Sequence, residues 1–304
     1  MAERRANLVL WLILGGGAFL FFTVSLLALA LYFSGEHSAP SLGLGLGFNQ
    51  IAVLDLEGVI YDSKEFTEQL KAYGGSSGVR AVVLRVNSPG GGVAASQEIY
   101  EAVKKFRAES NKRVVVSMAS VGASGAYYVA CAADRIVANP GTVTGSIGVI
   151  AEWYNYGGLL RWAKMEPVVI KSGALKDAGS PTRPLTEVEK AYFQSLIDSM
   201  YGQFVKAVAT GRKMDEGAVR RLADGRVFTG QEARNNGLID EIGTLQDAVA
   251  AAAKMAHISG EPRIVSPTRK KPSLWDMLFG DSREALPFNP DRSESHIRFQ
   301  YLWR

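Results

Sequence analysis

The chain contains few of the residues on which common catalytic, metal and cross-linking sites depend. Its 304 residues include one cysteine and three histidines. A single cysteine permits no intrachain disulfide, and Cys131 stands among apolar and small residues, which is typical of helix packing. His37 follows a long apolar segment, His257 follows an alanine-rich stretch, and His296 lies in a polar tail. The sequence therefore offers no base for a serine–histidine–aspartate triad, and no Cys/His cluster for a metal or cofactor.

A large excess of charge of one sign is also absent. The formal net charge is +4, and Arg269, Lys270 and Lys271 carry three of the positive charges in one short run. No broad basic surface is indicated, which argues against nucleic-acid binding. Hydrophobic residues make up 47% of the chain, a content typical of a globular protein with one large or two small domains.

One long apolar segment stands near the N-terminus. Residues 8–33 carry no charge and exceed the roughly 20 residues needed to span a bilayer. Two arginines precede the segment, so the positive-inside rule assigns residues 1–7 to the cytoplasm and the rest of the chain to the other side. We expect a single-pass transmembrane anchor. A cleaved signal peptide is the alternative, with Ala28-Leu29-Ala30 resembling a cleavage site.

Composition divides the rest of the chain into a linker, a folded domain and a tail. Residues 34–49 are rich in glycine, serine and proline, which is typical of a linker. We expect one compact domain over residues 50–265. A basic, proline-bearing run then opens the tail, residues 266–304.

The end of the tail has an alternating pattern. Ile297, Phe299, Tyr301 and Trp303 alternate with other residues as side chains on one face of a strand do. One interpretation is a disordered end. The other is that the tail adds a strand to a sheet edge or to a substrate groove, of its own or a neighbouring subunit.

Apolar runs alternate with helical patterns through the first half of the domain. Strands are predicted at residues 51–56, 79–86, 113–118, 135–138, 146–150 and 167–170, and helices at 63–73, 93–106, 124–133 and 158–164. Such alternation predicts an α/β fold with a mostly parallel sheet. Further helices are predicted at residues 186–210, 214–222, 230–236 and 244–255, the first of them opened by a capping box at Thr186.

A glycine run follows the second predicted strand. In Asn87-Ser88-Pro89-Gly90-Gly91-Gly92, the missing side chains would allow backbone N–H groups to approach a ligand, as in an oxyanion hole. No Gly-Lys-Ser/Thr follows, so the run is not a nucleotide-binding P-loop, and the dinucleotide fingerprint is met only in a looser variant ending at Ala95. A tight strand-to-helix turn is the simpler alternative.

A second small-residue run, residues 122–128, places Ser124 at the opening of a predicted helix. A serine hydroxyl is a poor nucleophile until a neighbouring base takes its proton, and no histidine is suitably placed. If Ser124 is a nucleophile, a lysine must be its base. Taken alone, such a serine is more often a helix cap or a packing residue.

Four segments together resemble a known family. Residues 87–92, 122–128, 144–149 and 171–177 occur in the order seen in the protease IV family of membrane-anchored serine–lysine peptidases, in the short, single-repeat form of signal peptide peptidase A. The resemblance covers about residues 51–258 and includes the later segments 223–230 and 237–243. It implies the fold shared with caseinolytic protease and the crotonases, with superhelical ββα units, a mostly parallel sheet and a helical C-terminal part.

The resemblance also implies roles for individual residues. The nucleophile corresponds to Ser124, the general base to Lys176, and the hydroxyl that orients the lysine to Ser146. The oxyanion would be held by the N–H of Gly90 or Gly91 together with that of Gly125. Lys171 competes for the role of base, but the family's lysine precedes an acidic residue, which selects Lys176.

This chemistry makes a physical demand on Lys176. An ammonium with the reference pKa of about 10.4 cannot accept a proton, so we expect burial to lower the pKa toward roughly 7 to 8. Asp177 would oppose that shift if its carboxylate faced the ammonium, so we expect the two side chains to diverge.

The function implied is that of a membrane-anchored serine endopeptidase that degrades released signal peptides and other short apolar peptides outside the cytoplasm. The resemblance implies a bacterial-type inner or cell membrane, a periplasmic or extracellular catalytic domain, and a domed homo-oligomer with the sites inside. No cofactor is implied. The alternatives are a crotonase-like acyl-thioester enzyme, which needs no Ser124 and Lys176 pair, and a non-catalytic membrane scaffold.

Overall fold

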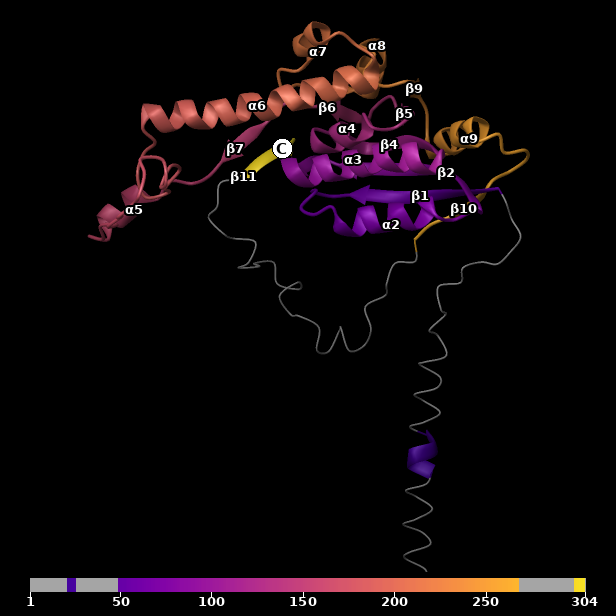
Figure 1. Ribbon diagram of the computed structural model, residues 1–304, viewed down its shortest axis with the longest axis horizontal. Helices are drawn as coiled ribbons and strands as arrows, with labels where there is room; N and C mark the ends of the chain where they lie inside the picture. The colour runs from indigo at the N-terminus through magenta and orange to yellow at the C-terminus, as the bar shows by residue number, and fades with distance from the viewer. Residues whose placement is uncertain (1–20, 26–48, 268–297, 304) are drawn as a thin grey trace, which may run out of the picture. The chain divides into compact units, whose positions relative to one another are not determined.

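The computed structural model describes residues 21–25, 49–267 and 298–303. The chain divides into two compact units, Met1–Leu46 and Gly47–Arg304, and the fold that follows is that of the second (Figure 1). Of the apolar segment at residues 8–33, only residues 21–25 are described, and they are helical. Within the described ranges, no helix has both the length and the apolar content needed to cross a membrane.

A parallel sheet forms the centre of the domain. The strands lie in the order β10-β1-β2-β4-β5-β9, and every pairing along this path is parallel. Their bounds are β1 Gln50–Glu57, β2 Val79–Ser88, β4 Arg113–Ala123, β5 Arg135–Ala138, β9 Glu241–Ile242 and β10 Arg263–Val265. The prediction of an α/β fold with a mostly parallel sheet is confirmed.

Both faces of this sheet are covered, which explains why its strands are apolar throughout. Ala52 and Leu54 face one cluster of buried side chains, whereas Ile51 and Val53 face the other. The first cluster is completed by α2 (Lys64–Gly74), α3 (Val93–Ser110) and α4 (Gly125–Ala130), and the second by α9 (Leu245–Met255). The alanines of α9, which include Ala248 and Ala252, allow this helix to lie close to the strands.

A long helix, α6 (Glu187–Arg212), runs across the top of the domain in Figure 1. The predicted capping box opens it: the Thr186 hydroxyl accepts a hydrogen bond from the Glu189 N–H, and the Glu189 carboxylate accepts one from the Thr186 N–H. After α6 come α7 (Glu216–Leu222), β8 (Val227–Thr229) and α8 (Gly230–Asn235). Strand β8 pairs with β6 (Val143–Gly145), and β6 pairs with β4 just before Ser124.

A small antiparallel sheet contains the end of the chain. In it, β11 (Arg298–Leu302) lies between β3 (Gly90–Gly92) and β7 (Ile150–Glu152). The strand predicted from the alternating tail residues is therefore present, and it joins a sheet of its own chain. The glycine run is itself a strand, because β11 pairs with one of its edges and Ile60 bridges to the other.

Two of the predicted strands are wrong. Residues 146–149 form no strand, since Ser146 has φ 48° and β7 begins only at Ile150. Residues 167–170 have no regular structure, and Val168 and Ile170 are 87% and 97% exposed. Their apolar, β-branched pattern indicated a strand, but no strand in the described part of the chain pairs with them. The helix predicted at residues 158–164 is present as α5 (Gly157–Trp162).

Residues 153–186, here called the arm, carry α5 and lead into the outer end of α6 (Figure 1). Arg183 links the arm to that helix. Its guanidinium donates to Glu189 at 2.9 Å and lies 3.0 Å from Asp177, which also pairs with Lys171. The hydrogen bonds from Arg183 hold the pKa of the buried Glu189 carboxyl down at about 2. Glu189 therefore stays ionised at neutral pH and anchors the arm.

We expect this anchor to make stability depend on pH. The folded-state pKa of Glu189 lies below its unfolded value of about 4.3, so its contribution is complete above that value and is lost as the pH falls toward about 2. Glu189→Gln should be less stable than the wild type by at least about 1 kcal/mol at pH 7, since a buried charge-assisted pair is weakened. The gap should narrow when unfolding is measured at pH 3.

The matched control is Glu187→Gln, which removes an exposed carboxylate of the same helical turn. It should change the free energy of unfolding by less than about 0.5 kcal/mol at either pH. A Glu189→Gln gap of equal size at pH 7 and pH 3 would contradict the assignment.

Candidate active site

Ser124 stands where β4 ends and α4 begins. Its backbone has φ 54° and ψ −119°, a conformation that costs a residue with a β-carbon on the order of 1–3 kcal/mol. Two hydrogen bonds hold it: the Ser124 N–H donates to the Gly145 carbonyl at 2.8 Å, and the Ser124 carbonyl accepts from the Tyr128 N–H at 2.8 Å. A strained turn between strand and helix is the arrangement that presents a nucleophilic hydroxyl.

Ser124 and Ser146 line the same pocket, which has a volume of about 460 Å³. They come together because Ser146 directly follows Gly145, whose carbonyl holds the Ser124 N–H. Ser146 also has a positive φ of 48°, and its N–H donates to the Arg226 carbonyl at 2.8 Å. The rest of the lining is largely apolar and includes Ile147, Val149, Ile150, Ile197, Leu302 and Trp303.

Three glycines surround a peptide carbonyl beside Ser124. A β-carbon at Gly90 would lie 2.1 Å from the Tyr301 carbonyl oxygen and 2.5 Å from the Gly125 nitrogen. A β-carbon at Gly125 would lie 3.1 Å from the same oxygen and 3.1 Å from the Gly91 nitrogen. The absence of side chains thus leaves a space that the Tyr301 carbonyl oxygen and the backbone nitrogens of Gly91 and Gly125 border, an arrangement typical of an oxyanion hole.

The hydrogen bonds of the glycine run distinguish its two candidate donors. The Gly90 N–H donates to the Ser88 hydroxyl at 3.1 Å. The Ile60 N–H donates to the Gly90 carbonyl at 2.9 Å, and the Gly92 N–H donates to the Ile60 carbonyl at 2.8 Å. Because backbone groups of successive strand residues point to opposite sides, the Gly91 N–H faces β11. Gly91 is therefore a better candidate donor than Gly90.

Lys176 does not lie with the other candidate residues. It belongs to the arm, its side chain is exposed, and it is not among the residues that line the Ser124 pocket. The burial expected for this lysine is not present in the single chain, because no described residue covers its side chain. The arm extends past the outer end of α6 (Figure 1). Asp177 pairs with Lys171 and Arg183, and no ion pair joins it to Lys176 among the described residues.

The sequence predicted no role for two serine hydroxyls that lie beside the glycines, those of Ser88 and Ser96. Ser88 supports the Gly90 N–H, and its place inside the glycine motif was a usable signal. Ser96 is completely buried, its hydroxyl has no hydrogen-bond partner, and a β-carbon at Gly125 would lie 2.4 Å from it. Nothing in the sequence distinguishes Ser96 from an ordinary buried serine of a helix.

The other reactive side chains have no place in this site. Burial raises the pKa of the Cys131 thiol to about 12, so it remains protonated, in keeping with a packing role. His257 is exposed after α9, and His37 and His296 lie outside the described residues. No group of three or more metal-binding side chains occurs in the described ranges.

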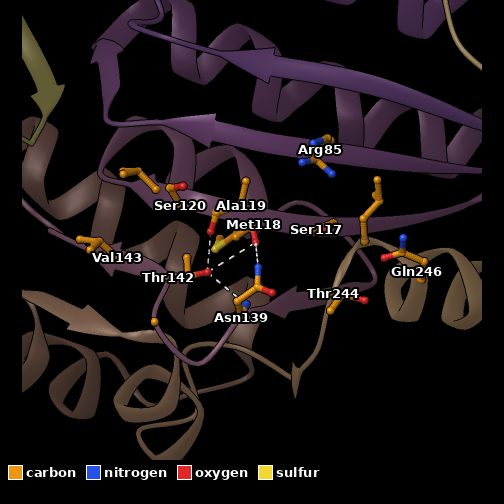
Figure 2. A pocket seen from close by; sticks show the side chains of 13 residues that line it. Arg85, Ser117, Met118, Ala119, Ser120, Asn139, Thr142, Val143, Thr244 and Gln246 are labelled. Atoms are coloured by element: carbon orange, nitrogen blue, oxygen red, sulfur yellow. Dashed lines mark hydrogen bonds between the residues drawn. The ribbon is translucent and has the colours of Figure 1, made fainter.

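A larger hollow of about 790 Å³ lies elsewhere on the domain, between the ends of β2 and β4 and the start of α9 (Figure 2). Two of its polar side chains hydrogen-bond to the backbone of β4. The Thr142 hydroxyl donates to the Ala119 carbonyl at 2.6 Å, and the Asn139 amide donates to the Met118 carbonyl at 3.2 Å. We therefore assign the chemistry to the smaller Ser124 pocket, where a strained serine meets backbone donors.

Known proteins resemble this chain over most of the domain. A family model described as peptidase family S49 matches residues 106–259, and a Clp protease model matches residues 53–141. A protein of Enterococcus faecium provisionally named signal peptide peptidase SppA is 39% identical, with the match covering 73% of this chain and 68% of that protein. A provisionally named protease of Synechocystis is 42% identical over 67% of this chain and 73% of its own length.

A longer protein is also similar to this chain. Protease 4 of Haemophilus influenzae is 33% identical over 69% of this chain but only 35% of its own length. The matches include the strands and turns that carry Gly90, Ser124 and Ser146. The resemblance seen in the sequence motifs is thereby confirmed, and the chain belongs to peptidase family S49, a family of serine peptidases.

Proposed function

We propose that the chain is a membrane-anchored serine endopeptidase that degrades released signal peptides and other short apolar peptides outside the cytoplasm. One observation carries the proposal: a peptide carbonyl, that of Tyr301, lies among the glycines beside Ser124. The apolar lining of the Ser124 pocket supports the substrate class. The charge-free segment at residues 8–33 and the arginines before it support a single-pass anchor in a bacterial-type inner or cell membrane.

The proposed reaction uses Ser124 and Lys176. The neutral Lys176 amine takes the hydroxyl proton of Ser124 as its oxygen attacks the substrate carbonyl carbon. The N–H groups of Gly91 and Gly125 hold the oxyanion that forms. The lysine then gives the proton to the leaving amine, and water hydrolyses the acyl-enzyme with the lysine again as base. The Ser146 hydroxyl orients the amine. No metal or nucleotide is required.

For this reaction, the Lys176 amine must lie at a Ser124 pocket and be shielded from water there. The arm that carries it exposes Tyr154, Trp162, Val168 and Ile170, each at least 81% exposed in the single chain. Large apolar side chains exposed together on one segment suggest a protein interface. We propose that the arm packs on a second copy in a domed homo-oligomer, so that Lys176 of one copy is buried at the Ser124 pocket of its neighbour.

The dyad is tested by substitution. In hydrolysis of a quenched, signal-peptide-like substrate by the detergent-solubilised protein, Ser124→Ala and Lys176→Ala should each lower kcat by at least about 10³-fold. The wild-type rate should rise with pH through an apparent pKa of about 7 to 8, because only the neutral amine accepts a proton. Lys171→Ala is the matched control on the arm and should retain most of the activity. Activity in folded Lys176→Ala would refute the base assignment.

The origin of the lysine is tested by mixing subunits. If the two residues come from different copies, co-refolded Ser124→Ala and Lys176→Ala chains form some sites with both residues intact. For random mixing in a symmetric ring, about a quarter of the wild-type activity should return. A mixture as inactive as its components, with mixed oligomers demonstrated by differential tagging, would contradict delivery by a neighbour.

The glycine cluster is tested by adding a β-carbon. Gly90→Ala should lower kcat/KM by about 10²-fold or more, because the new carbon occupies the place of the substrate carbonyl oxygen. Gly58→Ala is the control: Gly58 also has a positive φ, of 69°, but a β-carbon there meets nothing within 4 Å. The two variants should share the cost of backbone strain, and only Gly90→Ala should lose turnover and labelling by a fluorophosphonate. If Gly90→Ala and Gly58→Ala were equally active, the substrate carbonyl oxygen could not lie beside Gly90.

A further inference from the structure

The strand β11 lies in the candidate active site as an extended peptide with both edges paired. Tyr301 is paired with Gly91 of β3 on one side, and Phe299 with Ala151 of β7 on the other, both antiparallel. Beyond the strand, the Trp303 N–H donates to the Pro89 carbonyl at 2.9 Å. Backbone pairing of this kind gives affinity for an extended peptide, whereas pockets for its side chains give selectivity.

The side chain of Tyr301 fills an aromatic pocket next to the nucleophile. It is completely buried, and its ring stacks on Tyr128 with centroids 5.3 Å apart and approaches Phe204 at 4.7 Å. Its hydroxyl donates to the Met200 carbonyl at 2.9 Å. Tyr128 belongs to α4, and its N–H bonds to the Ser124 carbonyl, so the pocket and the nucleophile share one rigid helix turn.

The peptide bond after Tyr301 lies between the glycine cluster and the Ser124 pocket. The Tyr301 carbonyl oxygen is the one surrounded by Gly90 and Gly125, and the next two residues, Leu302 and Trp303, line the Ser124 pocket. The chain therefore crosses the site with Tyr301 in the position of the residue that would acylate Ser124. Two residues earlier, Phe299 is on the same side of the strand as Tyr301, with its ring centroid 6.4 Å from that of Phe193.

We propose that β11 is a built-in competitive ligand of the substrate groove, and that the aromatic pocket formed by Tyr128, Phe204 and the Met200 carbonyl recognises an aromatic side chain on the acyl side of the bond that is cleaved. A substrate must displace β11 and then inserts its own aromatic residue in place of Tyr301. The inference rests on the proposed function for the reaction, but binding and displacement are measurable without turnover. The opposing explanation is a permanent structural strand.

The first test uses the full chain with Ser124→Ala, so that no peptide is cleaved. Hydrogen exchange of the amides in residues 298–303 is followed with and without an excess of the peptide Arg-Phe-Gln-Tyr-Leu-Trp, which copies those residues. The peptide should remove the protection of the β11 amides while those of β3 stay protected, because the peptide replaces one strand with another. The same peptide with aspartate in place of its tyrosine should have no such effect. Undiminished protection of β11 at saturating peptide would overturn the proposal.

The second test uses the active full chain. Tyr301→Ser should lower the KM of a quenched peptide substrate by about 10-fold with little change in kcat, because a tethered competitor is weakened. Gln300→Ala is the control, a substitution in the same strand that leaves the aromatic pocket filled. An unchanged KM, or unfolding of Tyr301→Ser, would make β11 a structural strand and overturn the proposal. If no variant hydrolyses peptide, the proposed function fails, whereas the exchange experiment still decides whether β11 is displaced.

Discussion

The hydrogen bond from the Ser124 N–H to the Gly145 carbonyl is the contact on which the site depends. It joins the turn after β4 to the end of β6, and in doing so it holds Ser124 in a positive-φ conformation that few residues adopt. The same bond fixes the position of the next residue, Ser146, in the Ser124 pocket. The parallel sheet makes the bond possible, because parallel neighbours such as β4 and β6 end at the same edge.

A second constraint is the space left by missing side chains. A β-carbon at Gly90 would clash with the Tyr301 carbonyl oxygen and the Gly125 nitrogen, and a β-carbon at Gly125 would clash with the Ser96 hydroxyl. The glycines thus allow backbone nitrogens and a peptide carbonyl to share one small space, which donors on flexible side chains would define less rigidly. Their positions follow from pairing on two sides: Ile60 fixes one edge of the run and β11 the other.

The sequence predicted the local features of the site better than its long-range geometry. The alternation of apolar runs and helices was sufficient for the α/β class, and the Thr186 capping box marked the start of α6 correctly. Motif order identified Ser124, Ser146 and the glycines, which the structure brings together. The strand predicted at residues 167–170 is wrong because a β-branched apolar pattern does not distinguish a paired strand from an exposed segment without regular structure. The sequence also did not decide which edge the tail would join, since pairing partners far apart in the chain leave no local signal.

The proposed reaction requires two things that the described part of the single chain does not provide: a buried base and a groove free for substrate. A neutral amine at Lys176 needs a low-dielectric surrounding, yet the Lys176 side chain is exposed in the single chain. Among the described residues of a single chain, no lysine lines the Ser124 pocket, and β11 pairs with the glycine strand beside it. A second copy that supplies the base would complete the site, and a substrate would still have to displace β11 to use it. If the base comes from a neighbour as proposed, an isolated subunit would be inactive, and the assembled peptidase would select extended peptides that compete with its own strand.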